Sequence, residues 1–234
     1  MNYGLLLAAG KGSRFGGEKP KQFQFLLDRV VFSYSLRVFE DCQLIKGYGV
    51  LTPPGYEDRV ETYLAGLKEH KCKFIIQGGA SRRESVYKGL QELAEFSLKT
   101  VIIHDTARPA INEALLKRLY ERLDRGDVQG VIPVRPLRDT VKRLSVAEAD
   151  IVEKTVDRGQ LCRVQTPQLF DYEELIRAHR KCDNQREITD DAMLLELAQR
   201  RIATVEGLEE NQKLTYPSDR LLIEKFLKEQ GYGK

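Results

Sequence analysis

The sequence lacks the features that mark several large classes of protein. Its four cysteines form no Cys-x-x-Cys pair and no Cys/His cluster with zinc spacing. It contains no apolar run of about 18 residues, so no segment is predicted to span a membrane. Its beginning has neither the basic nor the long apolar segment of a secretory signal peptide. We therefore expect free thiols in a reducing compartment, the cytoplasm, and no membrane partner.

A strong excess of charge of one sign is also missing. The net charge is only +3 over 234 residues, so a nucleic-acid partner is not expected. Hydrophobic residues make up 41% of the chain and charged residues 31%, the balance of an ordinary globular protein. This length is sufficient for one large domain, which we predict to cover residues 1–234.

Apolar strand patterns alternate with helical ones along most of the chain. Strands are expected at 3–9, 47–51, 73–77, 100–104, 130–134 and 202–205, and helices at 30–39, 56–67, 82–94, 113–123, 172–181, 190–201 and 218–229. Such alternation predicts an α/β fold with a Rossmann-like, mostly parallel sheet flanked by helices. Ligands of such sheets bind at the carboxyl ends of the strands.

Residues 136–160 interrupt this alternation. Two short β-like runs, at 139–144 and 151–156, are separated by polar residues and predict a hairpin arm that projects from the domain. An isolated two-stranded hairpin is only marginally stable and needs a surface to pack on. A second copy of the chain is one candidate for that surface, and a solvated charged hairpin is the alternative.

The first strand leads into a glycine-rich loop that carries an arginine and three lysines, Lys11, Arg14, Lys19 and Lys21. The loop is not a P-loop, because Glu18-Lys19 follows Gly17 where Lys-Ser or Lys-Thr is required. Nor is it a dinucleotide fingerprint, because Phe15 takes the position of the third glycine. Bare N–H groups next to fixed positive charge are suited to a polyphosphate, with Arg14 and Lys21 aimed at it. A tight turn without a ligand is the alternative interpretation.

Two further motifs follow predicted strands. In Gln-Gly-Gly-Ala-Ser-Arg-Arg-Glu-Ser, at 77–85, Ser81 is expected to cap a helix with Glu84 as its partner. In His-Asp-Thr-Ala-Arg-Pro, at 104–109, Asp105 is a candidate Mg²⁺ ligand or a helix cap, and Arg108 a candidate anion site. His104 is expected to be structural.

These motifs together resemble a known family of nucleotidyltransferases. The run Leu-Ala-Ala-Gly-x-Gly-x-Arg with Pro-Lys-Gln is joined by His-Asp-x-Ala-Arg-Pro, Arg-Asp-Thr-x-Lys, Thr-Val-Asp-Arg, Gln-Thr-Pro-Gln and Asn-x-Lys-x-Thr. In this order they are similar to the 2-C-methyl-D-erythritol 4-phosphate cytidylyltransferases of the non-mevalonate isoprenoid pathway, over residues 3–228. The resemblance implies that CTP and the polyol phosphate react, with Mg²⁺, to a CDP-linked alcohol and pyrophosphate.

The resemblance also implies roles for individual residues. It assigns catalysis to Arg14, Lys21, Arg158 and Lys213; CTP binding to Ala8, Ala9, Gly10, Gly12, Gly79 and Ser85; polyol phosphate binding to Asp105, Arg108, Thr140, Thr189 and Thr215; and Mg²⁺ to Asp105. Thr140 and Arg158 lie on the arm, which in this family reaches into the partner subunit's site, so a homodimer is implied.

Two positions depart from the family pattern. Ala80 stands where an acid often follows the two glycines, and Phe15 stands where methionine is common. A ribitol-5-phosphate cytidylyltransferase and a non-catalytic CTP-binding regulatory module are alternative functions. A dinucleotide oxidoreductase is disfavoured by the failed glycine fingerprint.

Overall fold

The computed structural model describes residues 1–10, 12, 15–17, 19–148, 150–183 and 187–233. Its central element is strand β1 (Asn2–Leu7), which pairs in parallel with β4 on one side and β6 on the other. Among the described residues the main sheet has the order β10-β7-β11-β6-β1-β4-β5, with β12 also paired to β7. Its other strands are β4 (Gly47–Thr52), β5 (Cys72–Gln77), β6 (Thr100–Asp105), β7 (Gly130–Pro136), β10 (Cys162–Val164), β11 (Gln168–Asp171) and β12 (Ile202–Glu206).

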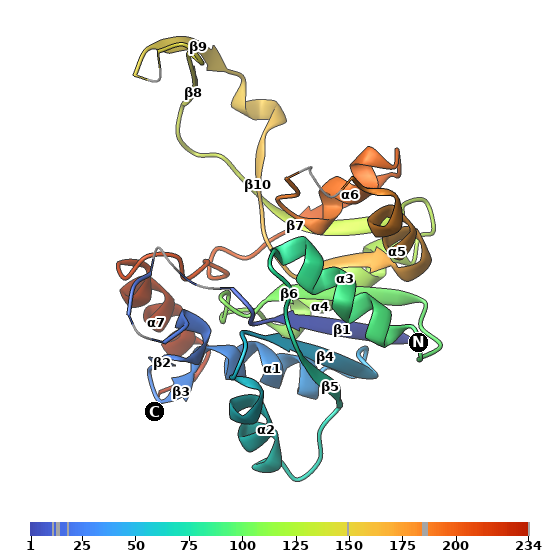
Figure 1. The fold of residues 1–234 in the computed structure, drawn as a ribbon. Coiled ribbons are helices and arrows are strands. Elements are labelled where there is room, and N and C mark those ends of the chain that lie inside the picture. The colour runs from blue at the N-terminus through green and yellow to red at the C-terminus, as the bar shows by residue number, and fades with distance from the viewer. Residues whose placement is uncertain (11, 13–14, 18, 149, 184–186, 234) are drawn as a thin grey trace.

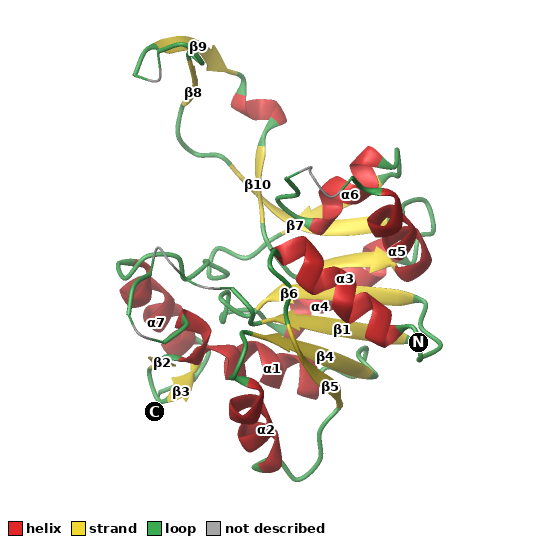
Figure 2. Cartoon of the chain, in the orientation of Figure 1, coloured by secondary structure: helices red, strands yellow, loops and turns green. Residues whose placement is uncertain are grey.

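The sheet is mostly parallel, as predicted. Strands β10 and β11 run antiparallel to their neighbours, and the sequence analysis missed both because they have only 3 and 4 residues. The chain moves from β1 to β4 on one side and later to β6 on the other. The carboxyl ends of β1 and β6 therefore lie at the switch point, where α/β sheets bind ligands. In Figure 2 the arrowhead of β1 points away from the N-terminus, toward the loops at this edge.

Helices cover both faces of the sheet. Alternate residues of β1 serve different cores: Leu6 packs in one with α1 and α4, and Leu5 in another with α3, α5 and α6. A third cluster joins α7 to α1 and to the hairpin of β2 (Phe25–Leu26) and β3 (Arg29–Val30). The helices are α1 (Val31–Asp41), α2 (Glu57–Ala65), α3 (Arg82–Leu93), α4 (Glu113–Leu123), α5 (Tyr172–Lys181), α6 (Asp191–Leu197) and α7 (Asp219–Glu229), with short 3-10 helices η1 (Lys21–Phe23) and η2 (Arg158–Gln160).

One helix boundary differs clearly from the prediction. A helix was expected through residue 201, but α6 ends at Leu197. Gln199 then adopts a φ of 55°, the left-handed region that ends a helix. The chain turns there and enters β12.

The hairpin arm is present between β7 and β10. Its strands β8 (Val141–Leu144) and β9 (Val152–Val156) pair antiparallel in a separate two-stranded sheet. Strands β7 and β10 pair below it, with Pro136 opposite Cys162. Figure 1 shows the arm extending well beyond the main sheet. Its apolar side chains Leu144, Val146 and Val152 are 50%, 102% and 52% exposed.

All four cysteines are free thiols. Within the described ranges, no helix has the length and apolar character needed to cross a membrane.

Candidate active site

The glycine-rich loop leaves the end of β1 at the switch point and returns at η1. Gly12 has a φ of +63°, which a residue with a side chain rarely adopts. A Cβ at Gly12 would lie 3.4 Å from Cγ of Lys21, so the lysine stem runs along the loop backbone. Lys21 is only 8% exposed. Arg14, the second cation predicted to face a phosphate, lies outside the described residues.

The second glycine turn packs directly on the first. A Cβ at Gly78 would lie 2.4 Å from Cβ of Ala9, so only glycine permits this close approach. Ser81 caps α3 as predicted, accepting a hydrogen bond from the Glu84 N–H at 3.1 Å. The Glu84 carboxylate accepts from the N–H of Ala80 at 2.8 Å, rather than from that of Ser81.

Ser85 holds the shape of this turn. Its hydroxyl accepts from the Gly79 N–H at 2.9 Å and donates to the Ser81 carbonyl at 2.8 Å. The Ser85 proton is therefore already used within the turn, and Ser85 is only 3% exposed.

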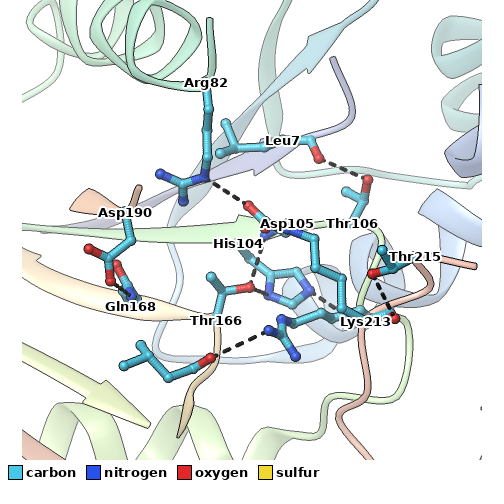
Figure 3. A network of polar contacts seen from close by, with 12 residues as sticks. Leu7, Arg82, His104, Asp105, Thr106, Thr166, Gln168, Asp190, Lys213 and Thr215 are labelled. Atoms are coloured by element: carbon cyan, nitrogen blue, oxygen red, sulfur yellow. Dashed lines mark hydrogen bonds and ion pairs between the residues drawn. The ribbon is translucent and has the colours of Figure 1, made fainter. Parts of the chain in front are cut away.

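Asp105 ends strand β6 and lies between two cations. Its Oδ1 is 3.2 Å from Nε of Arg82, and its Oδ2 is 2.7 Å from Nζ of Lys213. Burial alone would raise the pKa of this carboxyl, but Arg82 and Lys213 outweigh burial and hold the pKa well below its usual range. Asp105 is thus an anion that both cations share, as Figure 3 shows.

His104, directly before it, is fully buried and held from both ring nitrogens. The Arg108 carbonyl can only accept, so Nε2–H of the neutral ring points to it at 3.1 Å, with the Ser35 hydroxyl 3.0 Å from the same nitrogen. Nδ1 therefore accepts from the Thr166 hydroxyl at 3.1 Å, and that hydroxyl accepts in turn from the Asp105 N–H, also at 3.1 Å. Burial lowers the pKa of His104 to about 3, so the ring is neutral. These contacts agree with the structural role predicted for His104.

An extended segment brings Lys213 to this edge. The Leu214 N–H donates to the Ala107 carbonyl at 2.8 Å, next to the end of β6. Asn211 is buried and donates from Nδ2 to the Thr166 carbonyl at 2.8 Å, and Gln165 donates from Nε2 to the Leu208 carbonyl at 2.8 Å. The Gln-Thr-Pro-Gln motif therefore anchors the segment that carries Lys213.

These elements enclose two adjoining cavities. The first, of about 370 Å³, is named the glycine-loop cavity; it is lined by Ala9, Gly10, Gly12, Lys21, Gly79, Ser85, Arg82, Asp105, Lys213 and Thr215, among others. The second, of about 460 Å³, is named the Thr189 cavity; it is lined by Arg82, Asp105, Arg108, Thr189, Asp190 and Lys213, among others. Arg82, Asp105 and Lys213 line both and so form the boundary between them.

Most of the predicted site residues come together here, but not all. Ala8 is completely buried, does not line either cavity, and donates its N–H to the Leu51 carbonyl at 2.7 Å. A contact of Ala8 with the nucleotide stays a prediction; its N–H is bonded to β4. Thr140 and Arg158 lie exposed on the arm and line neither cavity of their own chain.

Sequence reasoning missed two charged residues at this boundary. Arg82, the first residue of α3, pairs through NH1 with Oδ2 of Asp191 at 2.7 Å as well as with Asp105. Asp191, the first residue of α6, is 1% exposed. Arg82 stands inside the quoted Gly-Gly motif, but nothing in a linear motif indicates which carboxylates its side chain reaches.

The side chains of the described residues do not form a metal site by themselves. No group of three or more His, Cys, Asp or Glu side chains is placed to hold a metal ion in the described ranges. Asp105 lines both cavities, whereas Asp190 and Glu196 line only the Thr189 cavity. One carboxylate together with substrate phosphates is a donor set that Mg²⁺ commonly accepts, so these residues fit a metal that arrives with a polyphosphate.

The comparisons with known proteins agree with this geometry. The family model for 2-C-methyl-D-erythritol 4-phosphate cytidylyltransferase matches residues 3–229. The enzyme of that name from Caldicellulosiruptor bescii is 38% identical over 231 residues, 97% of each chain. A bifunctional enzyme IspD/IspF from Paramagnetospirillum magneticum is 38% identical over 92% of this chain, and the chain spans 54% of that relative's length.

Solved structures show the same fold. The crystal structure of 2-C-methyl-D-erythritol 4-phosphate cytidylyltransferase from Francisella tularensis superposes with a TM-score of 0.80 at 26% identity, covering 96% of this chain and 99% of that one. The family model matches nearly the whole chain, and most of the motif residues gather at two adjoining cavities, so this chain belongs to the 2-C-methyl-D-erythritol 4-phosphate cytidylyltransferase family.

Proposed function

We propose that the protein transfers the cytidylyl group of CTP to 2-C-methyl-D-erythritol 4-phosphate. A phosphate oxygen of the polyol phosphate attacks the α-phosphorus of CTP, the new P–O bond forms, and the bond to the β-phosphate breaks to release pyrophosphate. One observation carries the proposal: the glycine turns, Lys21, Asp105 and Lys213 converge on the glycine-loop cavity.

The chemistry requires positioning and charge neutralisation rather than a covalent nucleophile. The N–H groups of the glycine loop and the ammonium of Lys21 would receive the triphosphate, and the turn at Gly79 and Ser85 would receive the base. Arg14 would add a further cation, as the motif implies. Lys213 would orient the attacking phosphate, and Arg108, Thr189 and Thr215 would contact the polyol phosphate.

Mg²⁺ is part of this proposal. Asp105 would be its protein ligand, and the metal, when bound, neutralises charge on the phosphates. Asp105 would also contact the hydroxyl groups of the polyol.

The arm extends the proposal to the oligomeric state of the protein. A hairpin with exposed apolar side chains, carrying Thr140 and Arg158 away from their own cavities, supports a homodimer in which each arm serves the partner's site. The described chain would then act as one nucleotidyltransferase domain with an appended arm. The cytoplasm, predicted from the free thiols, stays a prediction.

The experiment that tests the function is an assay of pyrophosphate release. Purified protein is incubated with CTP and Mg²⁺ and with either 2-C-methyl-D-erythritol 4-phosphate or ribitol 5-phosphate. We expect release with the first and at most a trace with the second. Release with ribitol 5-phosphate alone would replace the proposed acceptor, and CTP binding without release would indicate a regulatory module.

A further inference from the structure

Arg82 lies between two carboxylates that belong to different parts of the fold. Its Nε is 3.2 Å from Asp105 at the end of β6, and its NH1 is 2.7 Å from Asp191 at the start of α6. Figure 3 shows Arg82 and Lys213 approaching Asp105 from different elements. The Arg82 side chain therefore connects the start of α3, which follows the turn at Gly78 and Gly79, to the end of β6 and to the start of α6.

Asp191 fixes the far side of this guanidinium. It is 1% exposed, and burial raises the pKa of its carboxyl. Arg82 is the cation paired with it at hydrogen-bonding distance, and a buried carboxylate needs such a partner to stay charged. The pair thus limits the movement of the Arg82 side chain, which is itself only 25% exposed.

The two cations on Asp105 differ in their surroundings. The Lys213 side chain is 39% exposed, whereas the Arg82 side chain is 25% exposed and also paired with Asp191. A phosphate that enters the cavities competes with Asp105 for Lys213. When the lysine turns to that phosphate, Asp105 loses one of its two partners and keeps only Arg82.

We propose that Arg82, anchored by Asp191, is a positioning residue that holds the Asp105 carboxylate in place while Lys213 exchanges Asp105 for the substrate phosphate. This inference rests on the proposed function and deepens it. Arginine suits the role because its rigid fork reaches two carboxylates at once, which the single ammonium of lysine cannot do.

The test asks whether Arg82 affects activity separately from stability. It compares Arg82→Gln with a double variant in which the charge of its partner Asp191 is removed as well. Arg82→Gln leaves Asp191 buried without a counter-ion, so thermal stability should fall. The double variant Arg82→Gln/Asp191→Asn removes both charges and should recover most of the lost Tm. Arg83→Gln is the matched control, since Arg83 neighbours Arg82 on α3 and donates instead to the carbonyls of His179, Cys182 and Asp183.

We expect the double variant to regain stability without regaining activity. Its kcat/KM for the polyol phosphate should stay at least about tenfold below wild type, the loss expected for one charged hydrogen bond, while its KM for CTP changes by less than about threefold. Arg83→Gln should keep wild-type kcat/KM. A double variant that regains both Tm and kcat/KM would reduce Arg82 to a structural residue and overturn the proposal. An equal rise in KM for CTP would also overturn it, because Arg82 would then bind the nucleotide itself.

A crystal structure of the double variant gives a second result that does not depend on turnover. In crystals soaked with inorganic phosphate, which competes for Lys213, the Asp105 carboxylate should leave the position it holds against Arg82 in the parent. An unmoved carboxylate would contradict the proposal even if the wild-type protein proved inactive with this polyol phosphate. Inactivity of the wild type would by itself count against the proposed function only.

Discussion

Asp105 and Lys213 form an ion pair of 2.7 Å although they stand 108 positions apart in the chain. The pair lies at the boundary between the glycine-loop cavity and the Thr189 cavity, both of which it lines. Asp105 balances the lysine charge and holds Lys213 at this boundary. In the proposed reaction, the incoming phosphate would take over a cation that is already in position.

Lys213→Gln should therefore impair chemistry much more than folding. Loss of one cation that stabilises the transferring phosphate should lower kcat by roughly 100-fold, as loss of a positioned charge-stabilising donor does elsewhere. Tm should change much less than kcat, because this side chain is 39% exposed and Asp105 keeps Arg82 as a counter-ion. The control is Lys117→Gln on the outer face of α4, whose ion pair with Glu121 at 3.8 Å is exposed. A large fall in Tm with unchanged kcat would contradict the assignment.

Lys21→Ala should lower turnover by far more than it weakens CTP binding. Charge on the triphosphate grows and shifts as the bond to pyrophosphate breaks, so the contribution of Lys21 should increase in the transition state. We expect kcat to fall by about 100-fold and the Kd for CTP, measured by calorimetry, to rise less than about tenfold. Equal losses in both quantities would mean that Lys21 serves only ground-state binding.

Much of this arrangement was predictable from local sequence. Apolar runs located β1, β4 and β6 because these strands are buried at nearly every position. Helical spacing located α4 and α5 because each helix buries one face. The glycines and the Ser81 cap were predictable because their roles depend on backbone geometry a few residues away.

The rest depends on contacts between distant segments. Strand β11 has four residues and no period of its own; pairing with β6 and β7 defines it. Arg82 and Asp191 are 109 positions apart, and only the fold brings the first residue of α3 and the first residue of α6 together. The role of Thr166 likewise comes from the fold, which places its hydroxyl between the Asp105 N–H and the His104 ring.

Stability should decline in mild acid because of a buried histidine. His179 is 2% exposed and stacks on Tyr87 at 5.7 Å, and burial, with Arg83 and Arg82 nearby, lowers its pKa to about 3. The ring is neutral in the folded state, whereas the unfolded chain binds a proton below its ordinary pKa of about 6.5. The free energy of unfolding should thus be fully retained above about pH 6.5 and fall as the pH drops from there toward 3, by at most about 1.4 kcal/mol per pH unit.

The measurement is urea unfolding at several pH values between 6 and 4.5. His104, with a pKa also lowered to about 3 by burial, contributes in the same direction, so wild type should show the sum of both histidines. His179→Phe keeps an aromatic ring on Tyr87 and removes one titrating group. Its stability should therefore fall less steeply with acid than that of wild type. Identical slopes would show that His179 is not neutral in the folded protein.

A heterodimer of two inactive variants tests whether the arm of one subunit completes the active site of the other. Arg158→Ala and Lys21→Ala each inactivate every site of their own homodimers if both residues are needed. In a heterodimer of the two variants, one site combines an intact Lys21 with the partner's intact Arg158, and the other site lacks both.

If each arm serves the partner, the purified heterodimer should recover about half of the wild-type kcat per dimer, because one of two symmetric sites is complete. If each arm serves its own chain, each site keeps one lesion and activity stays at the level of the parents. A monomeric wild-type protein with full activity would remove the basis for sharing altogether.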